Sequence, residues 1–114
     1  MGIARCIQIE AFLPTEKALT AARIAERLSE DLALAQVHTA PHPEGGHIAR
    51  FTSAISGESW AEDVLIALTL AGRFGRDIRV NGRASEALTI AVIAPTVVGV
   101  ESVTLDLARE GEPE

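Results

Sequence analysis

The chain has 114 residues, and its 47% hydrophobic and 23% charged residues are typical of one globular domain and not of a disordered chain. The net charge of −6 disfavours nucleic acid and anionic membranes as partners, because both bind cationic surfaces. Since there is a single cysteine and no apolar stretch long enough to span a membrane, we expect a cytoplasmic protein without disulfides.

The chain opens with a strand pattern and then a helix pattern. Residues 3–13 alternate apolar and polar side chains, which predicts a strand with Ile7 on one face and Gln8 on the other. A proline ends this strand, and apolar residues at helical spacing over residues 15–32 predict an amphipathic helix. Thr15 is the residue type that caps such a helix.

Two further strands and a second helix follow. Residues 34–40 and 47–56 predict a strand pair, joined by a loop in which Pro and Gly favour a turn. In the next apolar stretch Ser59 and Glu62 form a capping box, and Gly75 lies where a helix ends. This pattern predicts a second helix between them.

The C-terminal third of the chain reads as strands. The dipeptide Asn81-Gly82 predicts a hairpin turn, because it is the strongest short-range hairpin signal. Residues 87–94 and 101–108 predict two more strands, and the acidic residues 109–114 predict a flexible tail. We therefore expect one α+β domain over residues 1–108.

The order βαββαβ with extra C-terminal strands resembles the ferredoxin-like arrangement, in which two helices cover one face of an antiparallel sheet. The order of elements carries this resemblance, and no signature residue does. The fold is shared by enzymes, regulators and inhibitors, so it implies no particular activity.

All three histidines lie within ten residues, at His38, His42 and His47, in and beside the predicted loop. Their spacing matches no strong zinc signature, although Glu44 could add an oxygen ligand. We expect a polar turn with solvated histidines, and keep a metal site or a general base as alternatives.

The arginines Arg73, Arg76, Arg79 and Arg83 form the only cationic cluster. Arg73 lies at a helix C-terminus, where the helix dipole favours a cation, whereas Arg76, Arg79 and Arg83 are candidates for binding an anion or an acidic partner. Nine arginines against one lysine suggest a G+C-rich genome, and thus a bacterial or phage origin.

The second helix has more apolar surface than one core face requires. Ile66 and Leu70 fall on the side opposite the main apolar face, near Glu62. Either the C-terminal segment covers this side or another molecule does. We take Ile66, Leu70, Glu62 and Asp63 as the candidate partner-binding residues.

No catalytic motif, nucleotide-binding loop or cofactor signature occurs, so we assign no catalytic residue and expect no cofactor. The leading hypothesis is a small acidic binding module that is not an enzyme and acts through a protein partner, as an inhibitor or immunity-type protein, or as a homodimer. The alternative is a ligand-binding or metal-dependent domain that uses the histidines and the arginine cluster.

Overall fold

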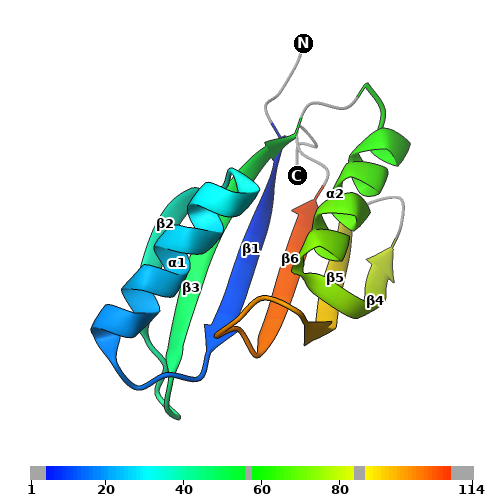
Figure 1. The fold of residues 1–114 in the computed structure, drawn as a ribbon. Coiled ribbons are helices and arrows are strands. Elements are labelled where there is room, and N and C mark those ends of the chain that lie inside the picture. Colours follow the sequence, from blue (N-terminus) through cyan, green and yellow to red (C-terminus); the bar gives the residue numbers. More distant parts are fainter. Residues whose placement is uncertain (1–4, 56–57, 84–86, 109–114) are drawn as a thin grey trace.

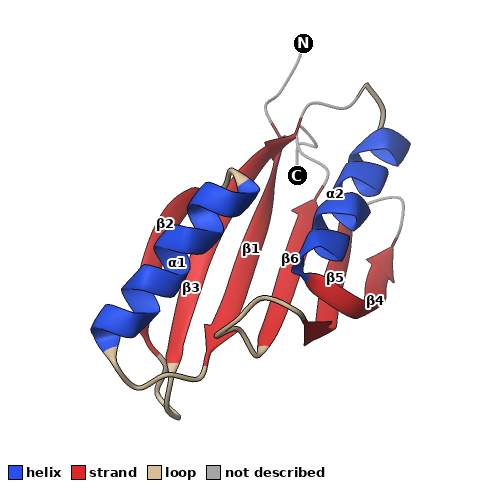
Figure 2. Ribbon diagram, viewed as in Figure 1, coloured by secondary structure: helices blue, strands red, loops and turns tan. Residues whose placement is uncertain are grey.

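The computed structural model describes residues 5–55, 58–83 and 87–108. It contains one six-stranded antiparallel sheet with both helices on the same face (Figures 1 and 2). The α+β class predicted from the sequence is therefore confirmed. The elements in chain order are β1 (Arg5–Leu13), α1 (Ala18–Leu32), β2 (Ala35–Pro41), β3 (His47–Ile55), α2 (Trp60–Phe74), β4 (Gly75–Arg83), β5 (Ala87–Pro95) and β6 (Ser102–Ala108).

The strand order is β2-β3-β1-β6-β5-β4. In the ferredoxin-like arrangement the strand that follows the second helix pairs with β1. Here β6 pairs with β1, while β4 forms the far edge of the sheet and is followed by β5 and β6 as a meander. The ferredoxin-like strand order is thus not confirmed, because the β4–β5 hairpin widens the sheet between α2 and β6.

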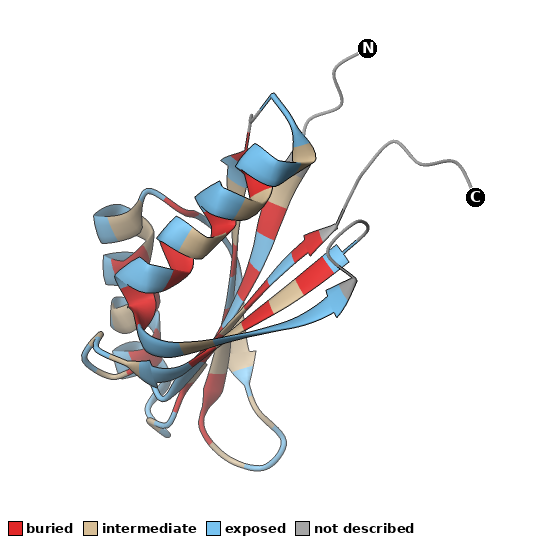
Figure 3. Ribbon diagram, turned by 90° about the vertical axis from the view of Figure 1, so that its right-hand side faces the viewer, coloured by how far each residue is buried: buried red, intermediate tan, exposed pale blue. Residues whose placement is uncertain are grey.

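The core lies between the sheet and the two helices. Along β1, Ile7 and Ile9 are buried while Gln8 and Glu10 are exposed, as the period of two in a strand requires (Figure 3). Helix residues that face the sheet include many alanines, which let the helix backbones approach closely. The buried helix residues with apolar side chains are Ala21, Ala25, Leu28, Ala67, Leu70, Ala71 and Phe74.

The helix boundaries agree with the sequence signals at α2 and differ at α1. Ser59 caps α2 and its side chain accepts a hydrogen bond from the Glu62 N–H at 3.2 Å, as predicted. The predicted Thr15 cap is wrong, because α1 begins at Ala18 with Lys17 as its N-cap. The Thr15 hydroxyl instead accepts from the Lys17 N–H at 3.2 Å, in the loop before the helix.

The hairpin between β4 and β5 exists, but its predicted turn at Asn81-Gly82 is wrong. Both residues belong to β4, where they pair with Thr89 and Leu88. Gly82 has φ +111°, and a Cβ there would come within 2.6 Å of the Ala87 carbonyl oxygen. The glycine therefore permits a close approach of two strands and does not form the turn.

Candidate functional site

The histidines do not come together in space. His38 lies in β2 opposite Arg50, with its side chain exposed on the face of the sheet that carries no helix. His47 opens β3 and is only 5% exposed, so the expectation of solvated histidines is wrong for this residue. Its Nδ1–H donates to the Thr15 carbonyl at 2.9 Å, which ties β3 to the loop before α1.

His42 has a local structural role in the loop between β2 and β3. Its Nδ1 accepts a hydrogen bond from the Glu44 N–H at 3.1 Å, and its ring meets the ring of Phe12 edge-on at 5.7 Å. Within the described residues, no three His, Cys, Asp or Glu side chains are placed to hold a metal ion. The metal alternative has no such cluster to support it.

The candidate anion-binding arginines lie on β4, at the edge of the sheet. Arg76 pairs with Ala94 and Arg79 with Ala91, so their side chains leave opposite faces of the sheet. Arg79 lies 3.6 Å from the Asp77 carboxylate. The side chain of Arg83 is outside the described residues. Arg73 at the end of α2 donates to the carbonyl of Asp31 in α1 at 3.3 Å.

The four candidate partner-binding residues of α2 separate into buried and exposed pairs. Leu70 is 8% exposed and Asp63 is fully buried, so the expected position of Leu70 on a free face is wrong. Ile66 is 42% exposed, and Glu62 is exposed with its carboxylate accepting from the Glu58 N–H at 3.0 Å. Of the four, Ile66 and Glu62 are the residues whose side chains are exposed, while Leu70 offers only a small part of its side chain to the surface.

A groove runs between α1 and α2, and Ile66 forms part of its wall. The groove has a volume of about 390 Å³. Leu65, which sequence reasoning did not select, is 63% exposed and lines the same wall. Leu65 lies in an uninterrupted apolar run, so a helical projection that included it would have extended the apolar patch. The lining residues are Leu32, Ala33, Ser53, Leu65, Ile66, Thr69, Leu70 and Arg73.

We call this surface the helix groove. One wall is the C-terminal end of α1, the other is the side of α2 that faces α1, and Ser53 of β3 contributes from the sheet. Leu65 and Ile66 are adjacent in sequence, so about 100° of helix separates them and their side chains widen the apolar wall. Exposed apolar side chains beside an apolar groove are typical of interaction surfaces.

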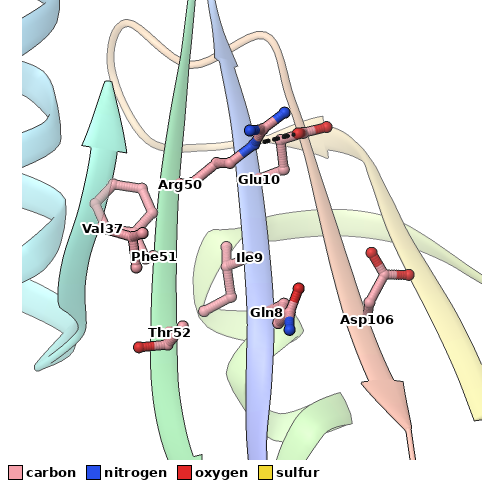
Figure 4. A pocket seen from close by; sticks show the side chains of 8 residues that line it. All are labelled: Gln8, Ile9, Glu10, Val37, Arg50, Phe51, Thr52 and Asp106. Atoms are coloured by element: carbon pink, nitrogen blue, oxygen red, sulfur yellow. Dashed lines mark hydrogen bonds and ion pairs between the residues drawn. The ribbon is translucent and has the colours of Figure 1, made fainter. Parts of the chain in front are cut away.

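The opposite side of the sheet carries no helix and forms a second surface, which we call the open face (Figure 3). Glu10 of β1 and Arg50 of β3 form an ion pair there, with Arg50 Nε 2.9 Å from Glu10 Oε2 (Figure 4). Both side chains are about half exposed. They lie between two shallow hollows of about 260 and 320 Å³.

The hollows of the open face bring together polar side chains from four strands and the β2–β3 loop. One is lined by Gln8, Ile9, Glu10, Val37, Arg50, Phe51, Thr52 and Asp106, and the other by Glu10, His38, Ala40, Pro41, His42, Pro43, Ile48 and Arg50. Asp106 also accepts a hydrogen bond from the Thr89 hydroxyl at 2.7 Å. Sequence reasoning missed Glu10, Arg50 and Asp106, because their proximity depends on strand order.

Comparisons with protein-family models, with curated proteins and with solved structures found no match for this chain. In the described part of the chain, no helix has the length and apolar character needed to cross a membrane.

Proposed function

We propose that the chain is a binding module, not an enzyme, and that it acts by holding a helical segment of a protein partner in the helix groove. The exposure of Leu65 and Ile66 on one wall of this groove carries the proposal. Neither side chain is needed to fill the core, whereas fully burying such a side chain stabilises a complex by about 1.5–3 kcal/mol.

The shape of the groove favours a polypeptide over a small molecule. Small-molecule sites enclose most of the ligand surface, whereas Leu65 and Ile66 remain largely exposed and leave the groove open along α2. An amphipathic helix that places apolar side chains every three or four residues can use such a groove. Leu32 and Leu70 would contact these side chains from the two sides of the groove.

The charge around the groove adds a requirement on the partner. Arg73 lines the groove and uses one N–H for the Asp31 carbonyl, and its guanidinium has further donors. Glu30 and Glu62 are exposed on the two helices outside the lining residues. We therefore expect a partner helix with an apolar stripe, an acidic residue that reaches Arg73, and basic residues on its flanks.

The test compares three forms of the tagged chain in the native host after chemical cross-linking. They are the unmodified chain, the double variant Leu65→Glu/Ile66→Glu, and Leu19→Glu as the matched control. Leu19 is 65% exposed on α1 and does not line the groove. Captured proteins are quantified by mass spectrometry, and circular dichroism checks that each variant is folded.

We expect a partner that the unmodified chain and Leu19→Glu capture equally and that the double variant captures at least about tenfold less, which corresponds to about 1.4 kcal/mol. A synthetic peptide of the partner's helical segment should then compete with the whole partner. Equal capture by all three forms, or the absence of any specific partner, would refute the proposed function.

A further inference from the structure

The open face extends across all six strands of the sheet. Many of its side chains are short, because they belong to alanine, serine, threonine or cysteine. The side chains that the pairing registers and the alternation along each strand place on this face are Cys6, Gln8, Glu10 and Phe12 of β1, His38 and Ala40 of β2, Ile48, Arg50, Thr52 and Ala54 of β3, Asp77, Arg79 and Asn81 of β4, Ala87, Thr89, Ala91 and Ile93 of β5, and Ser102, Thr104 and Asp106 of β6.

This composition suits close packing against another sheet. Alanine and threonine side chains allow two sheets to approach to about 10 Å, the usual spacing of packed sheets. Ile93 is 48% exposed on this face, and Val37 at the β2 irregularity is 60% exposed and lines one of the hollows. Both would lose water contact in such an interface.

The charge of the open face permits a second copy of the chain to approach. The chain carries a net charge of −6, yet on this face Glu10 lies beside Arg50, Asp77 lies beside Arg79, and Asp106 accepts a hydrogen bond from Thr89. The acidic excess lies on the helices and loops. The exposed acidic residues away from the open face include Glu16, Glu26, Glu30, Asp31, Glu44, Glu58, Glu62 and Glu101.

The area of the open face is sufficient for a dimer. Six strands spaced about 4.8 Å apart span about 24 Å, and strands of seven to nine residues are about 23 to 30 Å long. Each copy would therefore cover about 600 Å², or about 1,200 Å² for the pair before the corrugation of the side chains is added. Stable protein interfaces bury about 1,200 to 2,000 Å².

We infer that the open face is a homodimer interface, in which the sheets of two copies pack face to face about a two-fold axis. A two-fold interface places the same surface on both sides, so a face that carries both signs of charge can pair Glu10 of one copy with Arg50 of the other. This inference is independent of the proposed function, because the helix groove lies on the other side of the sheet (Figure 1).

The experiment measures mass by sedimentation equilibrium from low micromolar to submillimolar concentration. The test variant is Ala91→Glu, at a half-buried open-face position between Arg79 and Thr104. The matched control is Ala61→Glu, an exposed position on α2. We expect the unmodified chain and Ala61→Glu to reach twice the 12.1 kDa of one chain, and Ala91→Glu to dimerise at least about tenfold more weakly.

Cys6 provides a second measurement on the unmodified chain. It is the single cysteine, it is partly exposed, and its pairing with Ala54 places it on the open face. Its reaction with a thiol reagent should slow severalfold as the dimer forms, and this result stands even if Ala91→Glu fails to fold. A mass of one chain at all concentrations, unchanged dimerisation of folded Ala91→Glu, or equal thiol reactivity in monomer and dimer would overturn the inference.

Discussion

Replacing His47 with alanine tests whether the loop before the N-terminal end of α1 depends on a buried histidine. His47 is 5% exposed, and its Nδ1–H donates to the Thr15 carbonyl at 2.9 Å. The variant removes this hydrogen bond, worth about 1 kcal/mol, and leaves the partly buried carbonyl without its partner. Loss of the ring also leaves a gap, so the total cost is about 2–3 kcal/mol.

The matched control is His38→Ala, because His38 is an exposed histidine in the same β2–β3 hairpin, three register positions away from His47. Substitutions of exposed residues usually change the free energy of unfolding by less than about 0.5 kcal/mol. For a domain of this size, 1 kcal/mol shifts the Tm by about 4 °C, so His47→Ala should melt about 8–12 °C lower and His38→Ala within about 2 °C of the unmodified chain.

The assay is thermal unfolding followed by circular dichroism at neutral pH, with urea unfolding to give the free energy. Because the bond ties the loop before α1 to the first residue of β3, proteolysis should also cut this loop faster in His47→Ala. If the two histidine variants melt within about 3 °C of each other, the anchoring role assigned to His47 is wrong.

Three further outcomes follow from the burial and backbone geometry. Leu70→Glu should lower the free energy of unfolding by at least about 3 kcal/mol, because it buries a charge, and the variant should unfold on mild heating. Ile66→Glu should lower it by less than about 1 kcal/mol, because Ile66 is exposed. Equal losses in urea unfolding would contradict the burial of Leu70. Gly72→Ala should raise the free energy of unfolding by about 0.5–1 kcal/mol, because nothing lies near its added Cβ. Gly82→Ala should lower it by more than about 1 kcal/mol, because its added Cβ meets the Ala87 carbonyl. Melting curves that shift in the same direction for both variants would refute this contrast. A metal chelator should leave the Tm unchanged, and a fall of several degrees would point to a bound ion.

The secondary structure could be predicted from the sequence because its signals are local. Alternation places Ile7 and Gln8 on opposite faces of β1, and the Ser59 cap sets the start of α2. A predicted boundary is wrong where pairing with another strand overrides a local signal. Asn81-Gly82 reads as a turn in isolation, yet pairing with β5 extends the strand through it to Arg83.

The candidate sites were harder to predict because they depend on register and strand order. His38 and His47 are close in sequence, but the pairs His38–Arg50 and Pro41–His47 place them on opposite faces. Leu70 falls on the polar side of a helical projection and is nevertheless buried, because α2 meets the core over a wider arc than one flat face. No local sequence pattern indicates the register of β2 and β3 or the width of the buried arc of α2.

The helix groove exists because the strand order differs from the ferredoxin-like order. α1 packs on β2 and β3, whereas α2 packs on β4, β5 and β6, because α2 must carry the chain from β3 to the far edge strand β4. In a four-stranded ferredoxin-like sheet the second helix would return to the strand next to β1 and lie against the first helix. The β4–β5 hairpin displaces α2 outward, so the apolar side chains Leu32, Leu65 and Ile66 line a gap that neither helix closes. The same hairpin widens the open face, so both surfaces to which we assign binding depend on it.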